Sequence, residues 1–300
     1  MTTMQMAQAP TVRRRVKPSS VIIYAALTIL ALLCVLPMIL VAMISVTSEA
    51  ALAIHGYTFF PAEFSLDAYR TLFFGSSTIG QSYWISIVAT SIGTAIATLI
   101  TAAAGYTLSN KQVECRNGLS LYFFVTMVFN AGLVPWYMVC RMLGLTNNLW
   151  ALIVPSLMFS PFNLFLTRNF MRGIPDSLME SAKIDGANDL VICTRIYFPL
   201  SKPVLATIAL FYAIGYWNDW FNAVMLVVDS KLFTLQYFLY KIQSEISMLN
   251  KIAAGVQVSS PPLDTFKMAT AVVTIGPIIL LYPYLQRYFV KGLVIGGVKE

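Results

Sequence analysis

The residue types that usually carry enzyme chemistry are sparse in this 300-residue chain. It has one histidine, His55, and its four cysteines are widely spaced with no C-x-x-C pair, so no cluster with zinc-ligand spacing is present. The sequence also lacks the G-x-x-x-x-G-K-[ST] phosphate loop, the G-x-S-x-G nucleophile turn and the H-E-x-x-H zinc motif. We therefore expect a protein that is not an enzyme by itself and binds neither metal nor cofactor.

Polar and aromatic side chains are concentrated in one otherwise apolar segment, at Tyr216, Trp217, Asn218, Asp219 and Asn222. A carboxylate in lipid costs several kcal/mol, so such residues usually face a cavity or a partner. Amides and carboxylates hydrogen-bond sugar hydroxyls, and aromatic faces pack on sugar C–H surfaces. We interpret the segment as lining a passage for an oligosaccharide. The alternative is that the rings belong to the interfacial aromatic belt and Asp219 bonds another subunit.

A second candidate is the polar loop 168–202, which contains two helix patterns separated by a glycine. Pro175 and Asp176 are predicted to open the first helix, and Ser177 and Glu180 have the spacing of a capping box. Gly186 suits the end of that helix, because glycine adopts a left-handed conformation without Cβ strain. A second helix is predicted over about Asn188–Tyr197. Such a hairpin is either a rigid knob that couples a partner's motion to the flanking helices or a simple surface connection.

The elements that carry these residues are predicted to cross a membrane. The chain is 58% hydrophobic and only 11% charged, far below the charged fraction of ordinary soluble proteins. A crossing helix needs about 20 mostly apolar residues. Six segments meet this requirement: Ser20–Val46, Ser82–Leu108, Leu119–Val139, Asn148–Thr167, Val204–Val228 and Met268–Gln286. The predicted fold class is an all-α integral membrane protein with a cytoplasmic helix-turn-helix.

The lysines and arginines define the orientation of these six predicted spans. Fourteen of the 20 fall on the side that holds both termini and six on the other, so both termini are predicted to be cytoplasmic. The net charge of +7 is thus a topology signal, and we expect no nucleic-acid partner. The predicted layout is a basic tail at 1–18, a permease domain at 19–291 with the loop 168–202 inside and 229–267 outside, and a tail at 292–300.

Irregularities are expected within this layout. The residues that interrupt the third and fourth spans are Asn130, Pro135, Trp136, Pro155, Pro161 and Asn163. A proline either bends a helix and frees a carbonyl that can line a cavity, or only adjusts the packing between helices. In the outside segment 229–267, apolar residues recur near helical spacing and predict an amphipathic helix at the membrane interface.

The loop 168–202 resembles the E-A-A…G…I-x-x-P loop of ABC importer permeases. The matching residues are Glu180, Ser181, Ala182, Asp185, Gly186, Ala187, Ile196 and Pro199, with Ser181 in place of the usual alanine. The likeness extends over nearly the whole chain and favours the carbohydrate branch, similar to the smaller maltose-type permease and its complex-oligosaccharide relatives. Trp217-Asn218-Asp219 and the ending Gln286–Gly292 match in order.

The resemblance implies that these eight residues couple the chain to a cytoplasmic ATPase. It also implies a second homologous permease, two copies of the ATPase that hold ATP and Mg, an extracytoplasmic solute-binding protein and a bacterial inner-membrane location. The expected cargo is an oligosaccharide, with polysaccharide-derived and uronic-acid oligosaccharides among the candidates. The competing interpretations are an ion-coupled secondary transporter that uses Asp219, a membrane enzyme acting on lipid, and a scaffold that transports nothing.

Overall fold

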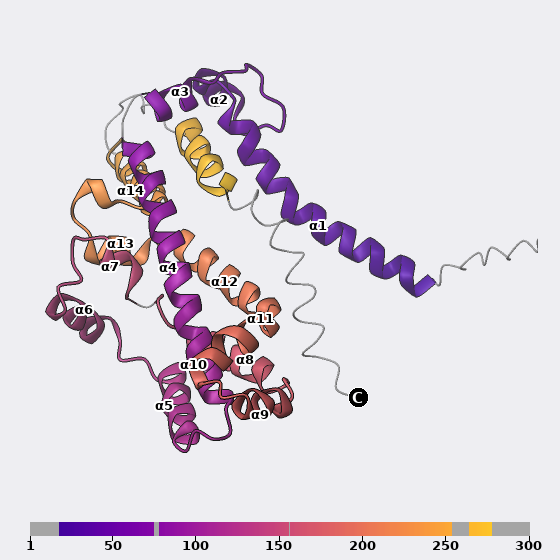
Figure 1. The fold of residues 1–300 in the computed structure, drawn as a ribbon. Helices are drawn as coiled ribbons and strands as arrows, with labels where there is room; N and C mark the ends of the chain where they lie inside the picture. Colours follow the sequence, from indigo (N-terminus) through magenta and orange to yellow (C-terminus); the bar gives the residue numbers. More distant parts are fainter. Residues whose placement is uncertain (1–17, 75–77, 156, 254–263, 278–300) are drawn as a thin grey trace, which may run out of the picture.

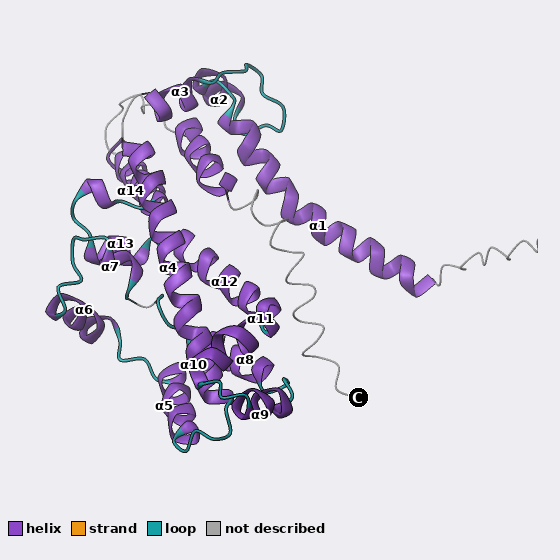
Figure 2. Ribbon diagram, viewed as in Figure 1, coloured by secondary structure: helices purple, strands orange, loops and turns teal. Residues whose placement is uncertain are grey.

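The computed structural model describes residues 18–74, 78–155, 157–253 and 264–277. Within these ranges all regular structure is helical, apart from one antiparallel bridge between Thr47 and Phe64 (Figure 2). The prediction of an all-α fold is therefore confirmed for this part of the chain. The predicted tails before residue 18 and at 292–300, and the second half of the sixth predicted span, lie outside the described residues.

Two long apolar helices correspond to the first two predicted spans. They are α1 (Pro18–Ser45) and α4 (Thr78–Ser109), and each is long and apolar enough to cross a membrane by itself. In Figure 1, α1 projects away from the other helices, and most of its side chains are exposed. The short helices α2 (Glu49–His55) and α3 (Asp67–Phe74) follow α1.

The third and fourth predicted spans are broken rather than continuous. Helices α5 (Arg116–Val128) and α6 (Leu133–Met142) are bent by 118° relative to each other. Gly132 at the bend has φ of +86°, which favours glycine, and its N–H donates to the Asn130 side chain at 2.8 Å.

Proline accounts for the break in the fourth predicted span. This span divides into α7 (Trp150–Ile153) and α8 (Pro161–Met171), with Pro155 in the break and Pro161 as the first residue of α8. Proline lacks an N–H, so it is tolerated at a helix start but not within a continuous ladder.

The fifth predicted span is also interrupted. Helix α12 (Lys202–Trp217) ends before Asn218, and α13 (Phe221–Leu226) begins three residues later. A 3₁₀ turn at Ser230–Leu232 leads to α14 (Leu235–Ala253), which confirms the helix predicted in the outside segment. A last helix occupies 264–277.

The predicted count of six spans goes beyond what the described helices alone show. Among the described residues, two single helices have the length and apolar character to cross a membrane. Two bent pairs pass the same test together, α5 with α6 and Asp189–Leu200 with α12, which gives up to four. The six-span arrangement with cytoplasmic termini remains a prediction.

Helix α4 is the centre of the molecule and packs against α8 and α12 (Figure 1). Small residues on α4 allow these close approaches. A Cβ on Gly105 would lie 2.7 Å from Thr167 Cγ2 on α8, and one on Gly93 would overlap the Tyr216 ring on α12. The core therefore depends on residues without side chains at these two crossings.

The loops separate to two ends of the bundle. Lys111 after α4 pairs with Asp176 at 2.5 Å, near the end where Figure 1 shows α5 and α9. At the opposite end, the Glu49 carboxylate accepts hydrogen bonds from the backbone N–H groups of Asp264 and Thr265, at 3.2 and 3.0 Å. Each of these two contacts joins segments that were predicted to share a side of the membrane.

Candidate functional site

The loop 168–202 forms the predicted pair of helices at one end of the bundle. The first is α9 (Asp176–Ile184), and the second comprises α10 (Asp189–Ile192), a π-helical turn at Cys193–Tyr197 and α11 (Phe198–Leu200). We call residues 176–200 the hairpin. Its second helix, over Asp189–Leu200, meets α12 at an angle of 83°. This helix continues through Pro199 to Leu200, beyond the predicted end at Tyr197.

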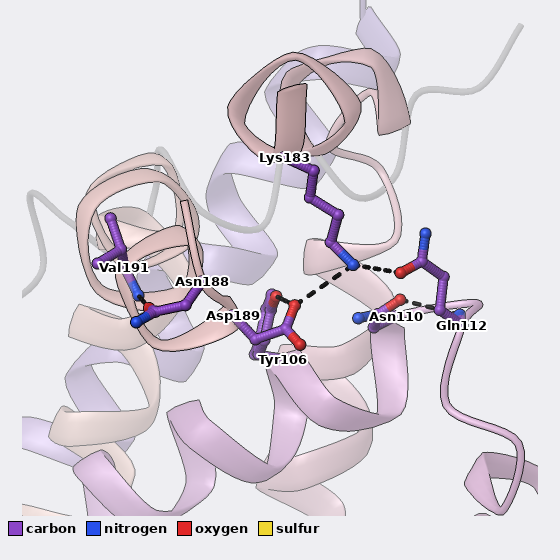
Figure 3. A network of polar contacts seen from close by, with 7 residues as sticks. All are labelled: Tyr106, Asn110, Gln112, Lys183, Asn188, Asp189 and Val191. Atoms are coloured by element: carbon purple, nitrogen blue, oxygen red, sulfur yellow. Dashed lines mark hydrogen bonds and ion pairs between the residues drawn. The ribbon is translucent and has the colours of Figure 1, made fainter. Parts of the chain in front are cut away.

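The turn between the two helices has the predicted conformation. Gly186 has φ of +82°, and the Asn188 side chain accepts a hydrogen bond from the Val191 N–H at 2.9 Å, which caps α10 (Figure 3). The predicted capping box is wrong. Pro175 is the N-cap of α9 and the helix begins at Asp176, which confirms the predicted start, whereas Ser177 lies inside the helix and is not its N-cap.

The underside of the hairpin is a buried apolar cluster that includes the end of α4. Its buried members are Tyr106, Met171, Met179, Ile192, Cys193 and Tyr197. The rings of Tyr106 and Tyr197 meet edge to face at 4.9 Å. The hairpin lies outside the predicted spans, and burial in this cluster raises the pKa of the Cys193 thiol to about 11. The hairpin and the end of α4 consequently share one core.

Polar contacts also join the hairpin to the end of α4 (Figure 3). The ammonium of Lys183 on α9 lies 3.5 Å from the Asp189 carboxylate on α10 and also donates to the Gln112 side chain beyond α4. The Tyr106 hydroxyl donates to Asp189 at 3.4 Å. Sequence reasoning missed Tyr106 and Gln112, because their partners lie 83 and 71 residues further along the chain and no local pattern links them.

The predicted coupling residues occupy both faces of the hairpin. Ala182, Ala187 and Ile196 are half-buried against the apolar cluster. The exposed members are Glu180, Ser181, Asp185, Gly186 and Pro199. Two apolar side chains that the motif does not single out are also exposed, Ile184 at 86% and Leu190 at 72%. We call the exposed apolar and acidic side chains Glu180, Ile184, Asp185 and Leu190 the ridge of the hairpin. A surface of this kind is typical of one that contacts another protein.

The second candidate segment, 216–222, lies where α12 ends and α13 begins. Three of its side chains are buried and hydrogen-bonded to backbone carbonyls elsewhere in the chain. Tyr216 donates to Ile153 O at 2.8 Å, Trp217 to Thr274 O at 3.2 Å, and Asn222 to Pro155 O at 3.0 Å. Tyr216 and Asn222 thereby satisfy two backbone carbonyls at the break between α7 and α8.

The other two predicted residues of this segment differ in exposure. Asn218 is exposed and accepts a hydrogen bond from Gln236 on α14 at 3.2 Å. Asp219 is half-buried, and one of its carboxylate oxygens accepts from the Asn222 N–H in the first turn of α13 at 3.2 Å. Trp220, which follows them, is 41% exposed.

In the described part of the chain, no group of three or more His, Cys, Asp or Glu side chains is placed to share a metal ion. The four cysteines are free thiols. The first candidate region is an exposed surface suited to contact with another protein. The second is a break between two helices that is lined by polar and aromatic side chains.

Comparison with known proteins covers both regions. Residues 117–295 match the family described as "Binding-protein-dependent transport system inner membrane component". The chain is 40% identical over 279 residues, 93% of its length and 97% of the relative, to "Polygalacturonan/rhamnogalacturonan transport system permease protein YtcP" of Bacillus subtilis (strain 168). It is 28% identical over 278 residues, 90% of its length and 93% of the relative, to "Arabinooligosaccharides transport system permease protein AraQ" of Halalkalibacterium halodurans.

A solved structure is similar as well. The chain matches a component of "a bacterial ABC transporter involved in the import of the acidic polysaccharide alginate" with a TM-score of 0.82 and 31% identity. The match covers 92% of this chain and 99% of that one.

Proposed function

The chain belongs to the family of binding-protein-dependent transport system inner membrane components, and on that basis we propose that it is the permease subunit of an ABC importer for an oligosaccharide. The observation that carries the proposal is the 40% identity, over nearly the full length of both chains, to a permease named for polygalacturonan and rhamnogalacturonan transport. The hairpin supplies the matching physical feature, a rigid surface at one end of the bundle.

The proposed cargo is an oligosaccharide derived from a uronic-acid polysaccharide. Polygalacturonan, rhamnogalacturonan and alginate all carry carboxylates on their sugar rings, and transporters named for them are similar to this chain. The relative named for arabinooligosaccharides is less similar, at 28% identity.

The proposed assembly contains this chain, a second homologous permease, two copies of a cytoplasmic ATPase that hold ATP and Mg, and an extracytoplasmic solute-binding protein. Its location is the bacterial inner membrane, with six spans and both termini in the cytoplasm. The basic excess on the predicted inner side and the separation of the loops to two ends support this orientation.

In the proposed mechanism the hairpin transmits motion of the ATPase to the spans. Glu180, Ile184 and Asp185 on the exposed ridge contact the ATPase. The buried cluster under the hairpin includes Tyr106, so a displacement of the ridge moves the end of α4 with it. Because α4 packs against both α8 and α12, the displacement reaches the helix breaks at the other end of these elements.

The substrate pathway is proposed to pass the break between α12 and α13. Asn218 and Asp219 are its predicted polar members on this chain, and the buried Tyr216, Trp217 and Asn222 hold the break in place. An ion-coupled mechanism through Asp219 is the alternative.

Reconstitution separates the two mechanisms. The test places the chain with its gene-neighbour permease, ATPase and binding protein in proteoliposomes and measures uptake of labelled oligogalacturonides. The proposal predicts uptake that requires ATP on the side of the membrane where the ATPase lies. This uptake should persist when ion gradients are dissipated. Uptake that continues without the ATPase and follows a proton or sodium gradient would overturn it.

A further inference from the structure

An open groove runs between α5 and α8, beside the hairpin. The two helices contact each other, and Figure 1 shows them at the same end of the bundle as α9. One part of the groove is lined by Ser120, Leu121, Phe124, Phe165, Arg168 and Asn169. The other part includes Lys111, Arg116, Arg172 and Asp176. Because Arg116 lies one turn before Ser120, and Arg172 one turn after Arg168, the two parts follow one another along the same helix faces. We call them together the α5–α8 groove.

The part of the groove that belongs to the predicted spans is apolar and open. Leu121 and Phe124 on α5 are 63% and 54% exposed, and Phe165 on α8 lines the groove with them. Helix α5 has no buried side chain at all. Lipid hydrocarbon covers such side chains without the cost that water imposes, so this part of the groove suits an acyl chain.

The part of the groove at the predicted cytoplasmic end carries positive charge that is not balanced. Among the described residues, no carboxylate lies within 4 Å of Arg116, Arg168 or Arg172, whereas Lys111 is paired with Asp176. Three guanidinium groups without an acidic partner therefore gather where the two helices leave the predicted spans.

Arg168 connects the apolar and basic parts of the groove. Its guanidinium lies over the Phe165 ring, 5.0 Å from the centroid, and donates to Ser120 Oγ at 3.1 Å and Asn169 Oδ1 at 3.3 Å. Both acceptors are neutral, so these bonds orient the guanidinium without neutralising it. An arginine whose stem follows apolar surface while its charge points to the interface is typical of a residue at a membrane boundary.

An anionic phospholipid matches both parts of the groove. Guanidinium groups bind phosphate oxygens through paired N–H groups, and basic pockets between membrane helices at the cytoplasmic side bind anionic head groups. We propose that the α5–α8 groove binds an anionic phospholipid of the inner leaflet, with the phosphate at the three arginines and an acyl chain along the apolar part. A free phosphate ion would leave the apolar part uncovered, and a neutral lipid would leave the arginines unbalanced.

The bound head group would lie against the hairpin. Asp176 and Tyr197 of the hairpin line the same part of the groove as Arg116 and Arg172. The lipid would therefore join the ends of α5 and α8 to the hairpin on the side away from the ridge.

The experiment measures which lipid the full assembly retains. The assembly is exchanged into nanodiscs that contain phosphatidylcholine and phosphatidylglycerol in equal amounts, and native mass spectrometry counts the molecules of each that remain bound after release. The wild type should retain phosphatidylglycerol in preference. Arg168→Gln should reduce this preference about fivefold, which is the usual contribution of one basic residue near an anionic membrane surface. Arg168→Lys keeps the charge and should lose less.

Two further variants separate the site from general effects. Arg172→Gln should reduce the preference as Arg168→Gln does, and its exposed side chain can be replaced without loss of packing. Lys202→Gln is the matched control, because it removes one exposed positive charge at the first residue of α12, outside the groove. It should keep the wild-type preference.

The outcomes distinguish the lipid from other occupants. Equal retention of the two lipids by the wild type, or an unchanged preference in both Arg168→Gln and Arg172→Gln, would overturn the lipid site. An equal loss in Lys202→Gln would show a general effect of charge and would also overturn it. Displacement of phosphatidylglycerol by millimolar inorganic phosphate would identify a free anion as the ligand instead. No sugar is present in these measurements, so their failure leaves the proposed function standing.

Discussion

The ring of Tyr216 on α12 lies directly over Gly93 on α4, and its hydroxyl donates a hydrogen bond of 2.8 Å to Ile153 O at the end of α7. One side chain thus joins three helices. The contact exists because Gly93 has no Cβ, and the hydrogen bond satisfies a carbonyl near the break that separates α7 from α8. Helix crossing and helix break are consequently coupled at this point.

Replacing Gly93 tests the helix crossing. Gly93→Ala places a Cβ within the Tyr216 ring and should destabilise the protein by about 1–3 kcal/mol, because the two helices must move apart. The melting temperature of the purified subunit or assembly in detergent measures this loss. Gly80→Ala on the same helix is the control, since nothing lies within 4 Å of its new Cβ. Equal melting temperatures for the two variants would contradict the packing.

The amide of Asn222 tests the helix break. Asn222 is 1% exposed and donates to Pro155 O at 3.0 Å, so Asn222→Ala leaves a buried carbonyl without its partner. The expected cost is about 1–3 kcal/mol, seen as a lower melting temperature. Asn218→Ala, four residues earlier and exposed, should cost far less. A larger loss from Asn218→Ala than from Asn222→Ala would show that the buried bond is unimportant.

Local sequence signals predicted the elements of the hairpin well. Gly186 acts through its own backbone, so its role was readable from the sequence, and the predicted start of the second helix at Asn188 falls on the residue that caps it. The capping box failed because it requires Ser177 to be the N-cap, whereas the start also predicted from the sequence, at Pro175 and Asp176, is the one observed. Propensity ranks such competing starts only weakly.

Contacts between distant segments were not predictable from the sequence. The hydrogen bond between Tyr106 and Asp189 joins residues 83 positions apart, and that between Gln81 and Lys231 joins residues 150 positions apart. The same limit applies to the substrate segment. Composition identified Trp217 and Asn222 as polar or aromatic residues in an apolar stretch, but only the arrangement of α12, α13 and the α7–α8 break places them in the interior. Asn130, Pro155 and Pro161 had indicated the interruptions of the third and fourth spans, whereas the break between α12 and α13 was not predicted.

Gly186 tests the conformation of the hairpin turn. Its φ of +82° costs a residue with a Cβ roughly 1–2 kcal/mol, so Gly186→Val should distort the turn and reduce sugar-stimulated ATP hydrolysis of the assembly. Gly118→Ala, in the first turn of α5 with open space around it, should have no such effect and should be neutral or slightly stabilising. Full stimulation in Gly186→Val would mean that coupling does not require this turn.

Ile184 tests whether the ridge of the hairpin contacts the ATPase. Its side chain is 86% exposed, so Ile184→Asp removes no packing within the chain and should leave the melting temperature of the isolated subunit unchanged. In an apolar interface, however, the new carboxylate is desolvated without a partner, and we expect at least a tenfold weaker association with the ATPase, measured by co-purification and titration. Ile54→Asp is the matched control, because Ile54 is 79% exposed on α2, at the opposite end of the bundle. Normal association in Ile184→Asp would place the ATPase contact elsewhere, whereas equal losses in both variants would point to a general effect of the added charge and contradict a specific role for the ridge.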